Sequence, residues 1–213
     1  MDDCCESKAS ELARLRERQG RVLWIVLGVN LVMFVVEFGA GIVIGSTALL
    51  ADSLDMLGDS FVYGFSLFVL YRSAAWRAGA ALSKGLVMVV FGLGVLVEAG
   101  LRLRAGVPPV APAMAGVGLL ALAANGFCFA LLWRHRADDV NLRSTWLCSR
   151  NDLVANGAVL AAVGLVAWTG SLWPDLVVGV GIAALFLRTA GGVLRESIAE
   201  LADARRAPAE SSG

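Results

Sequence analysis

Six apolar stretches, each close to membrane-spanning length, account for most of this chain of 213 residues. They cover approximately residues 22–44, 47–70, 82–101, 110–133, 146–168 and 173–194. A helix needs about 20 apolar residues to cross the hydrocarbon core of a bilayer, which is about 30 Å thick. The pattern therefore predicts an all-α polytopic membrane protein with six transmembrane helices.

The composition agrees with this interpretation and excludes two other classes of protein. Hydrophobic residues make up 58% of the chain and charged residues only 17%, whereas a soluble domain of this length needs a larger charged surface. The 18 basic residues balance the 18 acidic residues, which leaves no positive excess for binding a nucleic acid. We therefore expect the lipid bilayer, and no nucleic acid, among the partners of the chain.

The distribution of basic residues indicates how the six helices are oriented. Fifteen of the 18 Lys and Arg residues fall on the side of the two termini, Arg102 and Arg104 fall on the other side, and Arg150 falls inside a helix. Cytoplasmic loops carry an excess of Lys and Arg, so both termini are expected in the cytoplasm. The predicted location is the cell membrane, as a multi-pass protein of a bacterial inner membrane.

The predicted organisation has three parts. Residues 1–21 form a cytoplasmic N-terminal segment, residues 22–194 form the transmembrane domain, and residues 195–213 form a short cytoplasmic tail. Residues 10–19 combine helix-forming residues with mixed charge, which predicts a polar helix leading into the first span. The composition of residues 207–213 is typical of disorder.

Acidic residues inside the second and fifth stretches are the main indication of function. A charged side chain near the bilayer centre costs about 2.5–3.5 kcal/mol on insertion scales, so a cluster of carboxylates there needs compensation. Asp55 and Asp59 are four residues apart, which places both carboxylates on one helix face, about 6 Å apart along the axis. Cys148 and Asp152 have the same spacing. If the two helices pack together, three carboxylates and one thiolate converge as a four-ligand shell.

This set of donors favours a divalent metal over Na⁺ or an organic cation, because three or four negative charges need a doubly charged ion. A tetrahedral site with one sulfur favours Zn²⁺, or the softer Cd²⁺, over Mg²⁺ and Ca²⁺, which prefer oxygen ligands. The alternative for each Asp is a buried polar residue that hydrogen-bonds a neighbouring helix. The alternative for Cys148 is a small buried hydrophobe, with Asn151 or water as the substitute ligand.

Four further polar residues are candidates for supporting roles. Asp52 precedes the paired aspartates of the second stretch, and Asn156 lies one turn beyond Asp152 in the fifth. Asn30 and Glu37 of the first stretch are seven residues apart and share a helix face. Two interpretations of Asn30 and Glu37 are open: they line a cytoplasmic access path for the ion, or they form hydrogen bonds between helices.

A small soft and anionic cluster stands at the N-terminus, where Cys4 and Cys5 lie among acidic residues. A disulfide between adjacent cysteines is strained, so free thiols are expected. The two interpretations are capture and delivery of a metal ion, or an unordered terminus without a role.

These motifs resemble the cation diffusion facilitator family of metal/proton antiporters. LVMFVVEFGAGIVIGSTALLADSLDMLGDS is similar to that family's first span followed by S-x-x-L-L-A-D-x-x-[HD]-x-x-x-D. LAANGFCFALLWRHRADDVNLRSTWLCSRNDLVANGAVL is similar to its fourth-span Asn, basic loop and fifth-span H-x-x-x-D-x-x-x-[NS]-G, with Cys148 at the His position. SLWPDLVVGVGIAALFLRTAGGVLRESIAEL resembles its sixth span. The second-span and fifth-span motifs in this order are a specific signal.

The resemblance implies a secondary active transporter that exports divalent transition-metal cations from the cytoplasm in exchange for protons. The implied cargo is Zn²⁺-like, with Cd²⁺ or Co²⁺ as further candidates, and no cofactor is expected to stay permanently bound. Asp55, Asp59 and Asp152 are the implied metal ligands, and the implied assembly is a homodimer. Because only residues 195–213 follow the sixth stretch, we expect a short form without the family's cytoplasmic metal-binding domain.

Two other function classes compete with transport. The first is a non-transporting membrane metal sensor or accessory subunit that keeps the metal site. The second is an intramembrane enzyme, which the sequence disfavours because it has no HExxH motif and no nucleophile elbow, and its single His lies in a loop. We therefore expect a protein that is not an enzyme.

Overall fold

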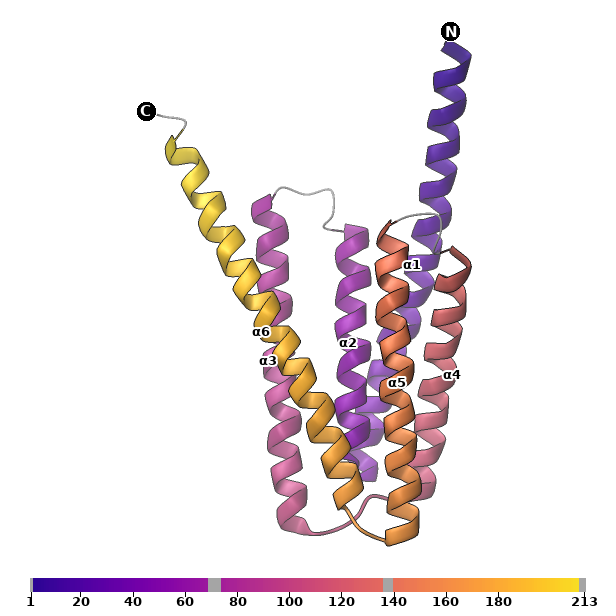
Figure 1. Ribbon diagram of the computed structural model, residues 1–213, viewed down its shortest axis with the longest axis vertical. Coiled ribbons are helices and arrows are strands. Elements are labelled where there is room, and N and C mark those ends of the chain that lie inside the picture. Colours follow the sequence, from indigo (N-terminus) through magenta and orange to yellow (C-terminus); the bar gives the residue numbers. More distant parts are fainter. Residues whose placement is uncertain (1, 69–73, 136–139, 211–213) are drawn as a thin grey trace.

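The computed structural model describes residues 2–68, 74–135 and 140–210, and within these ranges it contains six helices and no strand (Figure 1). The helices are α1 (Asp2–Ile44), α2 (Thr47–Phe68), α3 (Ala74–Ala105), α4 (Ala111–His135), α5 (Val140–Thr169) and α6 (Trp173–Glu210). Side chains are described for residues 20–64, 67, 76, 79–133, 152–199, 201 and 202. The predicted all-α architecture is confirmed.

Five of the helices, α1 and α3 to α6, contain a stretch long and apolar enough to cross a membrane. Helix α2 differs because its 22 residues include Asp52, Asp55 and Asp59, so any 18-residue window contains three charges. It lies at the centre of the bundle, where it contacts all five other helices (Figure 1). None of the described side chains of α2 is exposed. Its neighbours therefore shield the acidic helix from lipid, and α2 is the remaining spanning helix.

The bundle has two parts. Helices α3 and α6 form a closely packed pair, whereas α1, α2, α4 and α5 group on the other side, with α2 also contacting α3 and α6 (Figure 1). Both chain termini lie at one end of the bundle, which we call the terminal end (Figure 1). The short α1–α2, α3–α4 and α5–α6 connections lie at the opposite end. This arrangement agrees with six crossings and with both termini in the cytoplasm.

Helices α1 and α6 extend beyond the predicted spans. Helix α1 starts at Asp2 and continues without a break into the membrane-spanning part, so the helix predicted for residues 10–19 is confirmed. Helix α6 continues to Glu210, so the prediction of disorder for residues 207–213 is wrong over residues 207–210. The sequence before this region is rich in Ala, Leu, Glu and Arg, which are strong helix formers and let the spanning helix continue.

Helix α2 is anchored to α6 at the end opposite the termini. The Asp175 carboxylate accepts hydrogen bonds from Ser46 Oγ at 2.5 Å and from the backbone N–H groups of Thr47 and Ala48 at 2.7 and 3.1 Å. Ser46 Oγ in turn accepts the N–H of Leu49 at 3.1 Å, as an N-cap residue does. The first N–H groups of a helix lack partners within the helix, so these bonds fix where α2 begins.

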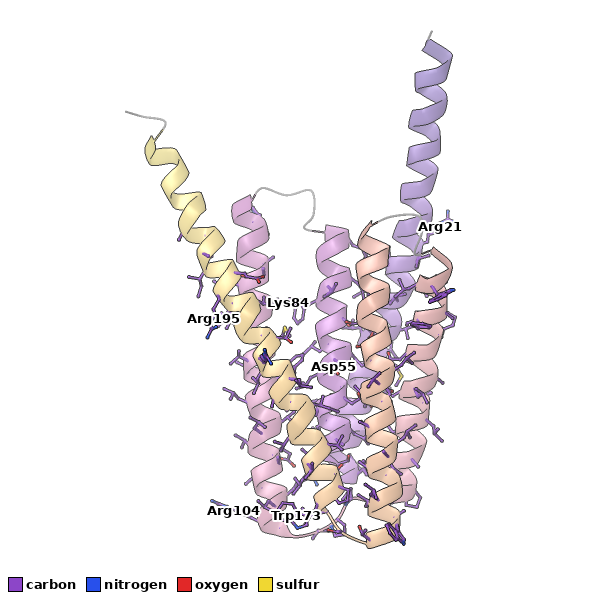
Figure 2. All side chains as sticks on the ribbon, in the orientation of Figure 1. Arg21, Asp55, Lys84, Arg104, Trp173 and Arg195 are labelled. Atoms are coloured by element: carbon purple, nitrogen blue, oxygen red, sulfur yellow. The ribbon has the colours of Figure 1, made fainter. Side chains whose placement is uncertain are left out.

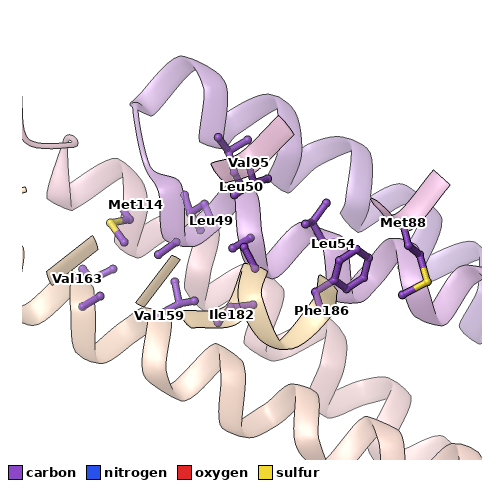
Figure 3. Close-up of a cluster of buried hydrophobic side chains, with 14 of the residues drawn as sticks. Leu49, Leu50, Leu54, Met88, Val95, Met114, Val159, Val163, Ile182 and Phe186 are labelled. Atoms are coloured by element: carbon purple, nitrogen blue, oxygen red, sulfur yellow. The ribbon is translucent and has the colours of Figure 1, made fainter. Parts of the chain in front are cut away.

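An apolar cluster fills the half of the bundle next to this anchor (Figure 3). Its larger buried side chains come from five helices and include Leu49, Leu50, Leu54, Met88, Val95, Met114, Val159, Val163, Ile182 and Phe186. Helices α2 and α6 approach closely here, because a Cβ on Gly179 would lie 2.6 Å from the Thr47 carbonyl carbon. The cluster closes the bundle at the end opposite the termini.

Candidate metal-binding cavity

A cavity of about 360 Å³ lies between α2, α3, α5 and α6. Its charged lining consists of Asp55 and Asp59 of α2, Asp152 of α5 and Lys84 of α3 (Figure 2 labels Asp55 and Lys84). The other lining residues are Thr189 and seven residues without a polar side chain, which are Gly58, Val62, Met88, Ala155, Ile182, Leu185 and Phe186. The second and fifth membrane-spanning helices thus contribute carboxylates to one cavity.

The three aspartates are arranged by helix spacing and by the contact between α2 and α5. Asp55 and Asp59 lie one turn apart on α2, and the Asp59 and Asp152 carboxyl groups lie within hydrogen-bonding range of each other across the helix contact. In this conformation, no three Asp, Glu, Cys or His side chains of the described residues are close enough to hold one metal ion. The aspartates therefore line a cavity, and their role as ligands stays a prediction.

The cavity belongs to the half of the bundle nearer the termini. Met88, Ile182 and Phe186 belong both to its lining and to the apolar cluster, so that cluster forms the floor of the cavity. The aspartates Asp55, Asp59 and Asp152 are half-buried, whereas the residues of the cluster are buried. The cavity therefore leaves part of each aspartate uncovered, while apolar side chains close the opposite end.

Two residues that sequence analysis missed complete the polar side of the cavity. Tyr63 is buried and donates its hydroxyl to Asp59 Oδ2 at 2.7 Å. Its position four residues after Asp59 is the signal that would have identified it. Lys84 interacts electrostatically with Asp59. Lys84 belongs to the third predicted stretch, residues 82–101, where it counted only toward the basic residues on the side of the termini. In the structure it lies on α3 and lines the cavity.

The supporting candidates Asp52 and Asn156 lie next to the cavity and do not line it. The Asn156 side-chain amide donates to Asp52 Oδ1 at 3.4 Å and to the Asp152 carbonyl oxygen at 2.9 Å. Both side chains are buried. The amide therefore connects α2 to α5 one turn beyond the cavity aspartates.

Glu37 and Asn30 of α1 have different surroundings, and neither lines the cavity. The Glu37 side chain is fully buried and interacts electrostatically with Asp52 and Asp55. Asn30 donates to the Val26 carbonyl oxygen at 2.9 Å and to Cys128 Sγ of α4 at 3.9 Å. Asn30 thus makes a hydrogen bond between helices, and the role of the pair in an access path stays a prediction.

The remaining predicted residues lie on helices but outside the described side chains. Cys148 is on α5, one turn before Asp152, and Cys4 and Cys5 are near the start of α1. Their proposed contacts with a metal therefore stay predictions.

A family model and several relatives match most of the chain. The family model is described as the cation efflux transmembrane domain, and it matches residues 23–202. The zinc transporter ZitB of Escherichia coli (strain K12) is 30% identical over 200 residues, which cover 87% of this chain and 63% of that protein. The metal cation efflux system protein CzcD of Cupriavidus metallidurans is 24% identical over 193 residues, which cover 84% of this chain and 60% of that protein.

A third relative is the cadmium, cobalt and zinc/H(+)-K(+) antiporter of Bacillus velezensis, which is 26% identical over 181 residues. That match covers 77% of this chain and 57% of the relative. The chain thus spans less than two thirds of the length of the relatives that it matches. Its apolar helices and its bacterial relatives make it a multi-pass protein of the inner membrane. The match over residues 23–202 shows that the chain belongs to the cation efflux transmembrane domain family.

Proposed function

We propose that the protein is a secondary transporter, and not an enzyme, that exports divalent transition-metal cations from the cytoplasm in exchange for protons. Zn²⁺ is the leading candidate cargo, and Cd²⁺ and Co²⁺ are further candidates. The names of the relatives support this proposal, since they include a zinc transporter and a cadmium, cobalt and zinc antiporter. The observation that carries it is the cavity lined by Asp55, Asp59 and Asp152.

The charge of the cavity matches a divalent ion. With all groups ionised, the three aspartates carry three negative charges and Lys84 carries one positive charge, so the formal charge of the described lining residues is −2. A buried charge is costly unless a partner compensates it. One M²⁺ ion neutralises this set, whereas one Na⁺ ion leaves a negative charge in a largely apolar site. The lining therefore favours a divalent cargo.

Metal and protons compete for the same carboxylates. Binding of M²⁺ requires deprotonated ligands, so it releases protons, and affinity falls as the pH falls. The cavity lies in the cytoplasmic half of the bundle, so it can receive metal from the cytoplasm. Release on the other side requires the apolar cluster to open, as two parts of the bundle rock around the site. Proton uptake there would favour metal release and allow an inward proton gradient to drive export.

The experiment that tests transport uses purified protein in vesicles that contain a metal-sensitive dye. An imposed pH gradient should drive uptake of Zn²⁺ by the wild type and not by Asp55→Asn or Asp152→Asn. Glu98→Gln is the matched control, since Glu98 pairs with Arg102 at 2.8 Å on α3 and does not line this cavity. Metal binding without flux in the wild type would overturn transport and favour the sensor or accessory subunit.

Cys148 supplies the test of metal preference. A thiolate is a soft ligand that favours Cd²⁺ and Zn²⁺ over harder ions. Cys148→Ser should therefore weaken Cd²⁺ uptake more than Co²⁺ or Mn²⁺ uptake in the same vesicles, and Cys148→His should shift the preference away from Cd²⁺. Equal effects of Cys148→Ser on all metals would exclude sulfur ligation.

The N-terminal thiols and the assembly are tested separately. If Cys4 and Cys5 capture metal, replacing both with Ser should raise the KM for metal without changing kcat, and an unchanged KM would reject capture.

The homodimer implied by the family resemblance predicts a particle of two chains in light scattering of the purified protein, and a mass of one chain would contradict it.

A further inference from the structure

Among the described residues, four buried oxygen atoms on three neighbouring helices have no hydrogen-bond partner. They are Glu37 Oε1 and Oε2 on α1, Asp52 Oδ2 on α2 and Asn156 Oδ1 on α5. The three side chains are at most 1% exposed. Buried polar atoms almost always have partners, because leaving them unpaired costs free energy. Four unpaired acceptors in one region therefore need an explanation.

These atoms belong to one cluster, which has Asp52 at its centre. The Asn156 amide lies 3.4 Å from Asp52 Oδ1, and the Glu37 carboxyl lies within hydrogen-bonding range of the Asp52 carboxyl. Two ionised carboxylates cannot bond each other, because both only accept hydrogen bonds. The described side chains of this cluster therefore lack a group that supplies positive charge or a donor hydrogen.

The charged groups around the cluster are acidic. From α2, Asp55 interacts electrostatically with Glu37, and from α5, Asp152 interacts electrostatically with Asp52. Helix α4 packs against α1, and its residues 111–133 contain no Asp, Glu, Lys, Arg or His. On α3, Lys84 lines the separate cavity. On α6, Asp175 is occupied by the start of α2. The described side chains therefore provide no cation at Glu37.

A proton satisfies this cluster best. Two carboxylates that share a site in apolar surroundings cannot both stay ionised, so one of them holds a proton. The protonated carboxyl then donates to the other, which pairs two of the orphaned oxygens. A divalent ion is less suitable, because Glu37 and Asp52 are only two anionic ligands and no group of three is present among the described residues.

The cluster also has a suitable place along the transport path. Asp52 lies about one turn before Asp55, and Asn156 lies one turn beyond Asp152. Since α2 and α5 run in opposite directions, both steps lead away from the cytoplasmic end. The carboxyl pair thus lies one turn deeper than the metal cavity, next to the apolar cluster that must open for release.

We propose that Glu37 and Asp52 form a proton-binding carboxyl pair that carries a proton exchanged for metal, with Asn156 as a positioning residue. The inference rests on the proposed antiport and adds a second proton site, one turn from the cavity, to the cavity carboxylates at which protons compete with metal. On the extracytoplasmic side, one O–H bond of a hydronium ion breaks as one O–H bond forms on the pair, which leaves water. On the cytoplasmic side, the O–H bond of the pair breaks as the proton forms an O–H bond with water.

Two kinds of flux in vesicles distinguish a proton carrier from a metal ligand. In Glu37→Gln and Asp52→Asn, uptake driven by a pH gradient should fall at least about tenfold, equivalent to about 1.4 kcal/mol. Exchange of Zn²⁺ across the membrane without a pH gradient should persist, and the Kd for Zn²⁺ should change by less than about threefold. The matched control Glu98→Gln should behave as wild type in all three measurements. Retained gradient-driven uptake would overturn the proposal, as would a loss of Zn²⁺ affinity equal to that of Asp152→Asn.

Infrared spectroscopy tests the pair without transport. The difference spectrum between wild type and Glu37→Gln, at neutral pH and without metal, should contain the C=O stretch of a protonated carboxylic acid. The difference spectrum between wild type and Asp52→Asn should contain the same band, and that of Glu98→Gln should not. If the wild type transports no metal, the proposed function fails while this band still tests the pair. Absence of the band from both difference spectra would overturn the proton-binding pair even if export is established.

Discussion

The carboxylate that contacts the start of α2 differs from the carboxylates farther along the bundle in the number of hydrogen bonds that it accepts. At the end opposite the termini, Asp175 accepts three hydrogen bonds, two of them from the backbone at the start of α2. Farther along α2, Asp59 accepts one hydrogen bond from Tyr63, and on α1 no described side chain donates to Glu37. A buried carboxylate with several donors is stable as an anion, whereas one without donors needs a cation or a proton. Asp175 thus fixes where α2 begins, whereas Asp59 and Glu37 are the acids for which we propose ion binding.

The largest effect is expected on metal affinity at the cavity. Asp55→Asn keeps the size of the side chain but removes one of the three negative charges. We expect the Zn²⁺ Kd to rise at least about 100-fold, equivalent to about 2.7 kcal/mol, in isothermal titration calorimetry. The thermal stability of the metal-free protein should not fall, because the change relieves repulsion between like charges. A variant that unfolds at a lower temperature and binds normally would place Asp55 with Asp175 as a structural acid.

The opposite result is expected for Asp175→Asn, which makes the same chemical change at the anchored end. The amide cannot accept all three hydrogen bonds, so buried donors at the start of α2 lose their partner. Such a loss costs about 1–3 kcal/mol. The midpoint of thermal unfolding in detergent should therefore fall, while the Zn²⁺ Kd of the folded protein stays near the wild-type value. A large loss of affinity at unchanged stability would contradict the separation of the two groups of acids.

The roles of these two groups differ in how far the sequence predicts them. The spacing of Asp55 and Asp59 is a local feature, so helical periodicity predicted that they share one helix face. The length of the apolar stretches is also local, and it predicted a bundle of membrane-spanning helices. Asp175 is different. An acid in the first turn of a helix is expected to stabilise its own helix, yet it accepts the N–H groups of α2, which depends on the packing of α6 against α2.

Tertiary packing also explains the other residues that the sequence did not assign. The contact of Glu37 with Asp52 depends on how α1 is rotated against α2, which helical periodicity alone does not define. The role of Lys84 was missed because its interaction with Asp59 depends on how α3 packs against α2, whereas the sequence shows only a basic residue near the start of the third apolar stretch. Tyr63 is the exception: it was also missed, but its spacing from Asp59 is local and would have been sufficient to predict their contact.

A moderate effect is expected from removing the hydroxyl group that orients Asp59. Tyr63→Phe keeps the buried ring and deletes the 2.7 Å hydrogen bond to Asp59 Oδ2. Partners that orient a metal ligand typically change affinity by about 10–100-fold when they are removed, and we expect the lower end because Asp59 keeps its charge. Zn²⁺ titration should show the weaker binding, with stability almost unchanged. Unaltered affinity would indicate that Asp59 is held by other contacts or is not a ligand.

The smallest effect, and the only gain of affinity, is expected at Lys84. Lys84→Gln removes the positive charge from the cavity lining, so the formal charge of the ionised cavity changes from −2 to −3. The cavity carboxylates attract a divalent ion more strongly when no neighbouring cation competes with it. Partial screening by solvent keeps this gain small, at about threefold in Kd. Lys84→Arg keeps the charge and is the matched control, for which we expect an unchanged Kd. Because the additional negative charge also attracts protons, the gain should be largest at high pH and should shrink as the pH falls. Weaker Zn²⁺ binding in Lys84→Gln at every pH would mean that Lys84 holds Asp59 in place for the metal. The cavity would then depend on a structural ion pair, just as the start of α2 depends on the hydrogen bonds of Asp175.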